Sequence, residues 1–272
     1  MIKLVVTGAA GRMGKVILQL AGRDPVFKIV GATEQRGHAV LGQDLGPILG
    51  RDPMGVKVQQ DPLAALKNAD VMIDFSHFTA LPENLAAAVK TRTACVIGTT
   101  GIPAKTLKQI RAASGKIPIV QSPNMSVGVN LLFDLAATAG KILDESYDLE
   151  ITEIHHRMKK DAPSGTALKL LEILAAARGR DIRKDVVYGR EGETGVREKG
   201  KIGVFALRGG DVVGEHTVSF FGDGERIDLV HKASSREAFA RGALLAAKFL
   251  AKKRQGLYHM RHVLGMDDGA LP

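Results

Sequence analysis

The feature that most constrains this chain is a run of three glycines between an apolar segment and an amphipathic one. After the apolar residues 2–7, the run reads Gly8-Ala9-Ala10-Gly11-Arg12-Met13-Gly14. Glycine suits such a turn because a side chain would keep the backbone away from a pyrophosphate, and the following helix offers free N–H groups to that anion. Glu34 ends the next apolar run, where an acid can bond the ribose hydroxyls. The spacing predicts a dinucleotide-binding turn, with a ligand-free glycine turn as the alternative.

The first 120 residues alternate short apolar runs with helical patterns. Strands are expected over residues 2–7, 27–33, 71–75, 94–98 and 117–120. Helices are expected over residues 13–22, 62–68, 80–91 and 103–114, and a long loop over residues 35–55. This alternation predicts an α/β, Rossmann-type domain, in which helices cover both faces of a parallel sheet.

The pattern changes after Pro123. Helices are expected over 127–143 and 168–178, and strands over 149–155, 202–207, 215–221 and 226–231. Consecutive strands predict an antiparallel or mixed sheet, hence a second domain of α+β type. A last helix over 236–253 carries one apolar face, made of Phe239, Ala243, Ala246, Ala247 and Leu250. Since this helix is expected to return to the first sheet, the predicted domains are 1–125 with 236–272, and 126–235.

Charge and composition narrow the classes of ligand. The net charge is +9, but aromatic residues make up only 4% and are not interleaved with Lys or Arg. The stacking platform of a single-strand nucleic-acid binder is therefore not expected, and an anionic cofactor with an acidic substrate fits the charge better. No apolar run is long enough to span a membrane. The single cysteine, Cys95, lies in an apolar strand and predicts a core position and a reducing cytoplasm.

Two further polar segments follow predicted strands of the first domain. Gly98-Thr99-Thr100-Gly101 follows one strand, and Ser122-Pro123-Asn124-Met125 follows the next. Ligands of open parallel sheets bind outside the carboxyl ends of the strands, so both segments are candidates for cofactor contacts. A plain Gly/Thr turn is the alternative for the first segment.

The densest group of reactive side chains lies in the second domain. It reads Glu153-Ile154-His155-His156-Arg157-Met158-Lys159-Lys160-Asp161-Ala162-Pro163-Ser164-Gly165-Thr166. Ser164 is a fit N-cap, and the free N–H groups of the next residues would bind a carboxylate. A His or Lys beside that site can donate a proton, and the clustered cations are expected to make one lysine a stronger acid. A solvated basic loop is the alternative.

A zinc site is not expected in this stretch. His155 and His156 are adjacent and would point to opposite faces of an extended strand. No HExxH pattern or cysteine accompanies them. We therefore predict that the chemistry of this stretch needs no metal.

These motifs resemble those of the dihydrodipicolinate (4-hydroxy-tetrahydrodipicolinate) reductase family of lysine and diaminopimelate biosynthesis. The resemblance covers the glycine run, residues 98–101 and 123–128, the stretch from Glu153 to Ala167, and residues 208–216. It implies hydride transfer from NADH or NADPH to a cyclic imine dicarboxylate. It also implies a homotetramer assembled through the second domain, which would then bind the substrate.

The resemblance also implies roles for particular residues. His155 and Lys159 match the proton donors, and His156, Gly165 and Thr166 match residues that hold the substrate carboxylate. The cofactor-contacting positions match Gly8, Ala9, Ala10, Gly11, Arg12, Met13, Glu34, Gly98, Thr99, Thr100, Ser122, Pro123, Asn124 and Met125. Two other hypotheses stay open: a reductase of another imine or aldehyde, and a non-catalytic nicotinamide-sensing protein.

The cofactor preference depends on the residues around Glu34. A carboxylate repels a 2′-phosphate and so favours NADH. Many family members have a basic residue directly after the acid, whereas this chain has Gln35 there, with Arg36 following. We therefore expect NADH to be favoured, while Arg12, Arg36 and His38 leave NADPH open.

Overall fold

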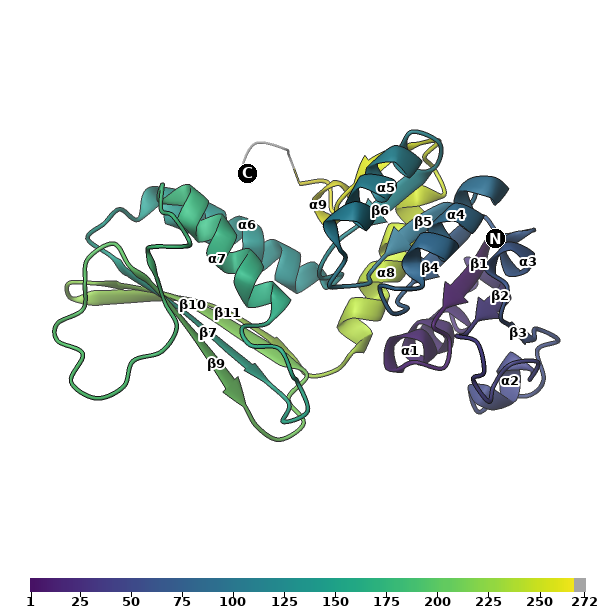
Figure 1. Cartoon of the computed structure of the whole chain (residues 1–272), viewed down its shortest axis with the longest axis horizontal. Helices are drawn as coiled ribbons and strands as arrows, with labels where there is room; N and C mark the ends of the chain where they lie inside the picture. Colours follow the sequence, from purple (N-terminus) through teal and green to yellow (C-terminus); the bar gives the residue numbers. More distant parts are fainter. Residues whose placement is uncertain (267–272) are drawn as a thin grey trace. The chain divides into compact units, whose positions relative to one another are not determined.

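The computed structural model describes residues 1–266, and its contacts divide them into two units (Figure 1). The first unit comprises residues 1–127 and 236–266, and the second comprises residues 128–235. The last six residues of the segment 236–272, which the sequence assigns to the first domain, lie outside the described residues. Each unit has its own sheet and its own core.

The first unit is built on a parallel sheet of seven strands in the order β12-β6-β5-β4-β1-β2-β3. The strands are β1 (Ile2–Thr7), β2 (Phe27–Thr33), β3 (Val58–Gln59), β4 (Val71–Asp74), β5 (Ala94–Ile97), β6 (Pro118–Gln121) and β12 (Gly256–Tyr258). All pairs are parallel. Strands β4 and β5 are buried along their whole length, because helices cover both faces of the sheet. The predicted Rossmann-type domain is confirmed.

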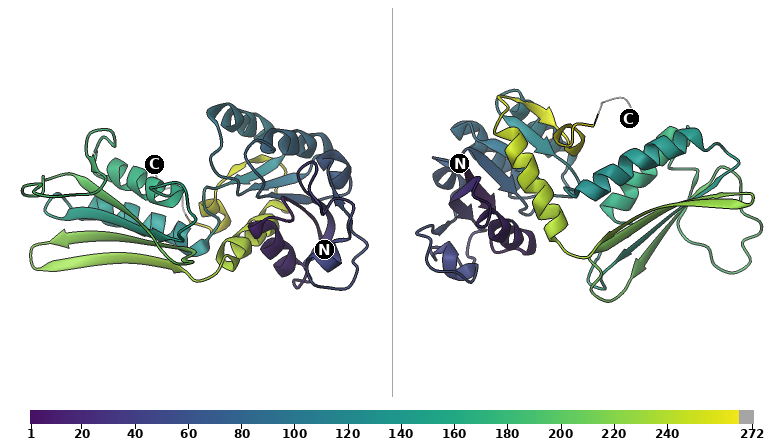
Figure 2. Two further views of the ribbon diagram at one scale, coloured as in Figure 1. Left: turned by 60° about the horizontal axis from the view of Figure 1, so that its bottom comes forward. Right: turned by 180° about the vertical axis from the view of Figure 1, so that it is seen from behind.

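Two groups of helices make these layers (Figures 1 and 2). Helices α1 (Arg12–Ala21) and α8 (Glu237–Leu250) share a core with Leu4 and Val6 of β1. Helices α3 (Pro62–Leu66), α4 (Leu81–Thr91) and α5 (Ala104–Ser114) pack on the other face, where Val5 points. Cys95 is fully buried on that face, as predicted for a core residue.

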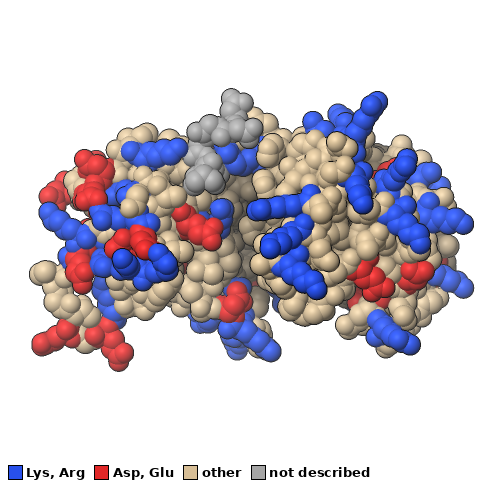
Figure 3. Space-filling view, turned by 45° about the horizontal axis from the view of Figure 1, so that its top comes forward, with Lys and Arg blue, Asp and Glu red and all other residues tan. Residues whose placement is uncertain are grey.

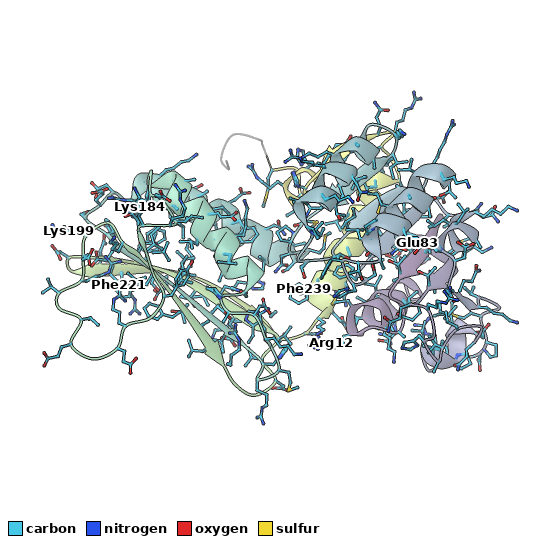
Figure 4. The ribbon with its side chains drawn as sticks, in the orientation of Figure 1. Arg12, Glu83, Lys184, Lys199, Phe221 and Phe239 are labelled. Carbon is cyan, nitrogen blue, oxygen red and sulfur yellow. The ribbon has the colours of Figure 1, made fainter. Side chains whose placement is uncertain are left out.

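One residue of the predicted apolar face of α8 is not part of the buried face of the helix. Phe239, labelled in Figure 4, is only half-buried, whereas Ala240 is fully buried. The buried stripe begins at Ala240 and continues through Ala243, Ala247 and Leu250, and Phe239, one residue earlier in the first turn, lies at its margin.

The shortest elements escaped prediction. Residues 35–55 contain α2 (Leu45–Ile48), whose N-cap Asp44 accepts a hydrogen bond from the Gly46 N–H. Strands β3 and β12 and helix α9 (Met260–Val263) are also unpredicted. Two to four residues are too few for a periodic pattern, so these elements depend on their tertiary partners.

The second unit is a mixed sheet in the order β11-β10-β7-β9-β8, with two helices on one face (Figure 2). Its strands are β7 (Asp148–His155), β8 (Val186–Val187), β9 (Ile202–Arg208), β10 (Gly214–Gly222) and β11 (Glu225–Ala233). Strand β10 is antiparallel to β7 and β11, whereas β7, β9 and β8 run parallel. The predicted α+β unit with a mixed sheet is confirmed.

Helices α6 (Val127–Ile142) and α7 (Gly165–Ala177) form the core of the second unit with the inner face of its sheet. Leu149 and Ile151 of β7 alternate into this core with Val218 and Phe220 of β10. Helix α7 begins three residues before the predicted start at residue 168, because Ser164 caps it. Within residues 1–266, no helix is both long and apolar enough to cross a membrane.

Candidate active site

The turn between β1 and α1 has the form that a pyrophosphate requires. Gly8 has a φ of +71°, a conformation that other residues rarely adopt. A Cβ on Gly14 would lie 2.1 Å from the carbonyl oxygen of Gly8, so α1 can pack this closely only with glycine there. The N-cap, Gly11, has no capping side chain, and Arg12 stands at the start of the helix (Figure 4). The N-terminal amides of α1 are therefore suited to bind an anion.

A cavity of about 620 Å³ opens beside this turn, within the first unit. Its wall includes Gly8, Ala10, Gly11 and Glu34 from the predicted cofactor residues. The Glu34 carboxylate accepts hydrogen bonds from the N–H groups of Ala10 and Gln35, both at 2.9 Å. The acid therefore lies directly beside the glycine turn, the place where an acid can bond ribose hydroxyls in a dinucleotide-binding fold.

The other predicted cofactor residues stand outside the wall of this cavity. They are Ala9, Arg12, Met13, Gly98, Thr99, Thr100, Ser122, Pro123, Asn124 and Met125. The strand order nevertheless brings their segments to one edge, since residues 98–100 follow β5 and residues 122–125 follow β6. Strand β1 stands between β2 and β4, at the point where the strand order reverses and ligands of such sheets bind.

Asp74 organises this edge and was not predicted as a site residue. Its carboxylate is fully buried at the end of β4 and accepts from the hydroxyls of Thr99 at 2.7 Å and Ser76 at 2.8 Å. Asn84 donates to its other oxygen at 2.8 Å. The sequence feature that could have identified Asp74 is an acid at the end of an apolar strand. In the structure, Asp74 fixes the loops around the cavity.

In the second unit, β7 presents a buried acid to a histidine. Glu153 and His155 lie two residues apart, so both side chains point to the same face. The Glu153 side chain is fully buried, and its Oε2 lies 2.5 Å from His155 Nδ1. Arg208 of β9 donates to both oxygens of Glu153, at 2.8 and 2.9 Å. Burial raises the pKa of Glu153, but the bonds from His155, Arg208 and the Ser164 N–H outweigh it and lower the pKa to about 2.

Lys159 follows in a turn closed by its own N–H and the carbonyl of His156, at 3.0 Å. Its ammonium is paired with both oxygens of Asp161, at 2.8 and 2.9 Å. Burial raises the pKa of Asp161, but Lys159 lowers it below its usual value. The effect predicted for this lysine depended on the surrounding cations alone. The structure adds a carboxylate, that of Asp161, which holds the ammonium in place.

The N-terminus of α7 lies beside this cluster. Ser164 is its N-cap, as predicted, and its Oγ accepts a hydrogen bond from the N–H of Ala167 at 3.2 Å. Gly165 is exposed, and apart from its chain neighbours and its own helix backbone, a Cβ added there would meet no atom of residues 1–266 within 4 Å. Thr166 is buried behind it. The open space at the first helical residue suits a carboxylate bound by free amides.

His216 of β10 contacts the same N-terminus of α7. Its Nε2 is hydrogen-bonded to Ser164 Oγ at 3.2 Å, and its ring meets the His155 ring edge-on at 5.2 Å. Burial, followed by the charge of His155, lowers the pKa of His216 to about 3, so the ring is neutral near pH 7. The predictions missed Arg208 and His216 because only the register of β9 and β10 on β7 brings them here.

Comparisons with known proteins identify the family of the chain. The family model described as "Dihydrodipicolinate reductase, N-terminus" matches residues 2–125, and "Dihydrodipicolinate reductase, C-terminus" matches residues 128–264. A 4-hydroxy-tetrahydrodipicolinate reductase of Anaeromyxobacter sp. (strain Fw109-5) is 52% identical over 98% of each chain. One of Syntrophobacter fumaroxidans is 46% identical over 98% of this chain and all of its own.

A solved structure shares the fold. It is a dipicolinate-bound dihydrodipicolinate reductase from Paenisporosarcina sp. TG-14, with a TM-score of 0.73 and 22% identity over 95% of this chain and 97% of that one. A Rossmann-type sheet with a second unit of this family, in a chain whose relatives are named as reductases, defines an NAD(P)H-dependent oxidoreductase. Because the two family models together cover nearly the whole chain, the chain belongs to the dihydrodipicolinate reductase family.

Proposed function

We propose that this protein reduces 4-hydroxy-tetrahydrodipicolinate to tetrahydrodipicolinate with NAD(P)H, in lysine and diaminopimelate biosynthesis. The relatives that carry this name match the chain from end to end. The observation that carries the proposal is the cluster at the end of β7, where a histidine and a lysine, each held by a carboxylate, adjoin a helix N-terminus suited to an anion. A cyclic imine dicarboxylate requires both a proton and a carboxylate site.

His155 and Lys159 are the proposed proton donors. The reduced nicotinamide supplies the hydride when it is bound. His155 holds one proton on Nδ1 toward Glu153, which leaves Nε2 to hold a proton for the substrate. Lys159 Nζ holds the second available proton and is positioned by Asp161. Proton donation of this kind contributes roughly 10²–10⁴-fold to a rate.

His156, Gly165 and Thr166 are proposed to hold a substrate carboxylate. The amides of the first turn of α7 would donate to the carboxylate oxygens, and the positive end of the helix dipole adds to the attraction. His156 directly follows the strand that carries His155, so this site and the proton donors share one short loop.

Replacing Gly165 by alanine separates folding from substrate binding. Because Gly165 is the first residue of a helix and its Cβ position is empty, alanine is expected to stabilise the protein by about 0.5–1 kcal/mol. The same methyl would occupy the carboxylate space, so KM for the imine should rise about tenfold, as for one lost hydrogen bond to a charged group. Thermal unfolding and steady-state kinetics check the two effects. An unchanged KM would place the carboxylate elsewhere.

The cofactor site is proposed at the carboxyl edge of the first sheet. Residues 8–13 and Glu34 would bind the pyrophosphate and ribose, and residues 98–100 and 122–125 would reach the nicotinamide half. Glu34 with Gln35 supports a preference for NADH. No metal is proposed, since a histidine and a lysine supply the protons.

A homotetramer built on the second unit is also proposed. On the face of its sheet opposite α6 and α7, Leu207, Phe221 and Val230 are 48%, 39% and 51% exposed. Exposed apolar side chains on one sheet face are typical of a subunit interface. Light scattering is expected to give four times the 29.0 kDa chain mass, and a monomer would contradict the proposal.

Small anionic molecules are the proposed ligands, and the cytoplasm the proposed location. In Figure 3, Lys and Arg side chains are scattered over the drawn face of each unit with acidic ones among them. A dispersed charge of this kind supports attraction of small anions rather than a nucleic-acid or membrane surface. The buried thiol of Cys95 supports a reducing compartment.

A further inference from the structure

We propose that Glu153 is a positioning residue that ties the proton donor His155 to the carboxylate-binding end of α7. The inference rests on the proposed function. One buried carboxylate contacts the histidine and the helix cap, and it reaches the loop that carries the lysine through Arg208, so a single side chain influences the geometry of all three.

The contacts divide between the two oxygens. Oε2 accepts from His155 Nδ1 at 2.5 Å and from Arg208 Nη1 at 2.9 Å. Oε1 accepts from the Ser164 N–H at 3.0 Å and from Arg208 Nη2 at 2.8 Å. The four donor groups belong to three residues from different parts of the chain: His155 of β7 itself, Arg208 of β9, and Ser164, the N-cap of α7. A carboxylate with four donors is held rigidly, and it holds them in return.

For His155, the carboxylate determines which ring nitrogen can exchange a proton with the substrate. An acceptor at Nδ1 keeps a proton there, so the imidazole can exchange its second proton only at Nε2. Nε2 faces β10, where a Cβ on Gly214 would lie 3.0 Å away.

For the substrate carboxylate, Glu153 fixes the end of the helix. Its bond to the Ser164 N–H anchors the N-cap directly before the amides of Gly165 and Thr166. Arg208, held by Glu153, also donates to the carbonyl of Asp161 at 2.7 Å. The loop that carries Lys159 is therefore attached to the same carboxylate through one arginine.

The test compares Glu153→Gln with a matched control on the same strand. Glu150 also pairs with two arginines, Arg190 and Arg197, but it lies on the opposite face of β7. Glutamine at 153 can still accept from the Ser164 N–H, but it removes the charge and presents an amide to His155. We expect kcat for imine reduction to fall roughly 10²-fold, the lower range for a misplaced proton donor. KM should change only a few-fold and NADH affinity should not change.

The split between kcat and KM distinguishes positioning from a structural role. Without the carboxylate the His155 ring loses the acceptor that orients it, so kcat should fall while KM and NADH affinity stay close to wild type. Glu150→Gln should keep the wild-type kcat and KM, and Glu153→Asp should recover part of kcat. A folded Glu153→Gln protein with wild-type kcat would overturn the inference.

A second measurement needs no variant at position 153. In the wild-type protein, the ¹⁵N NMR shifts of the His155 ring should show a proton on Nδ1, where Glu153 accepts it. A neutral ring that carries its proton only on Nε2 would overturn the inference as well. Failure of the proposed function looks different: wild-type protein that binds NADH would then leave the imine unreduced, whatever stands at position 153.

Discussion

Replacing Lys159 by alanine is expected to lower the turnover of imine reduction by roughly 10²–10⁴-fold, the usual contribution of a positioned proton donor. The ammonium is held by Asp161 at the end of the loop that joins β7 to α7. Its loss removes a proton source and leaves the dinucleotide turn, which lies in the other unit, untouched. NADH affinity, measured by fluorescence titration, should therefore stay within about twofold of wild type.

Lys160 provides the control, because it adjoins Lys159 but is exposed. Lys160→Ala changes the net charge equally, so it reports any loss that comes from the positive field alone. We expect this variant to keep turnover within a few-fold of wild type. If both variants lost turnover equally, or if Lys159→Ala kept full activity, the assignment of Lys159 as a proton donor would be wrong.

Acidification is expected to destabilise the fold first through His216 and then through Glu153. The pKa of His216 is lowered to about 3 in the fold, so the unfolded chain takes up its proton first and stability falls between about pH 6.5 and pH 3. The lowered pKa implies a loss of about 5 kcal/mol over this range. Glu153, with a pKa of about 2, adds a loss of about 3 kcal/mol as pH falls below about 4.5.

Urea unfolding at fixed protein concentration and stepped pH measures this dependence. His216→Gln keeps an amide near the position of Nε2, which bonds Ser164, but it does not titrate. Its free energy of unfolding should therefore fall less steeply between pH 6.5 and pH 4 than that of wild type. Identical slopes for the two proteins would show that His216 does not carry this part of the acid sensitivity.

Where a local pattern decided the structure, the sequence was a good guide. Strands β1 and β2 have their predicted ends, because each is mostly apolar and buried after an exposed lysine at its second position, as in a covered parallel sheet. The cap at Ser164 was also predicted, since N-cap chemistry depends on its own neighbours. The short elements α2, β3 and β12 were missed because their partners lie far away along the chain.

In the candidate site, too, the residues that are close in sequence were predicted, and those that the fold brings together were not. The loop from His155 to Thr166 could be predicted because its reactive residues are consecutive in sequence. The residues that orient them could not, since Arg208 and His216 reach Glu153 and Ser164 only through strand register. Asp161 was within the motif, yet its pairing with Lys159 required the turn that the structure shows.

The proposed imine reduction is tested by following NADH and NADPH oxidation with imine freshly made by the synthase that supplies it. We expect rapid oxidation of the cofactor that depends on the imine. Oxidation should be faster with NADH than with NADPH because of Glu34 and Gln35. Folded protein that binds NADH but oxidises neither cofactor in the presence of the imine would contradict the proposed reaction.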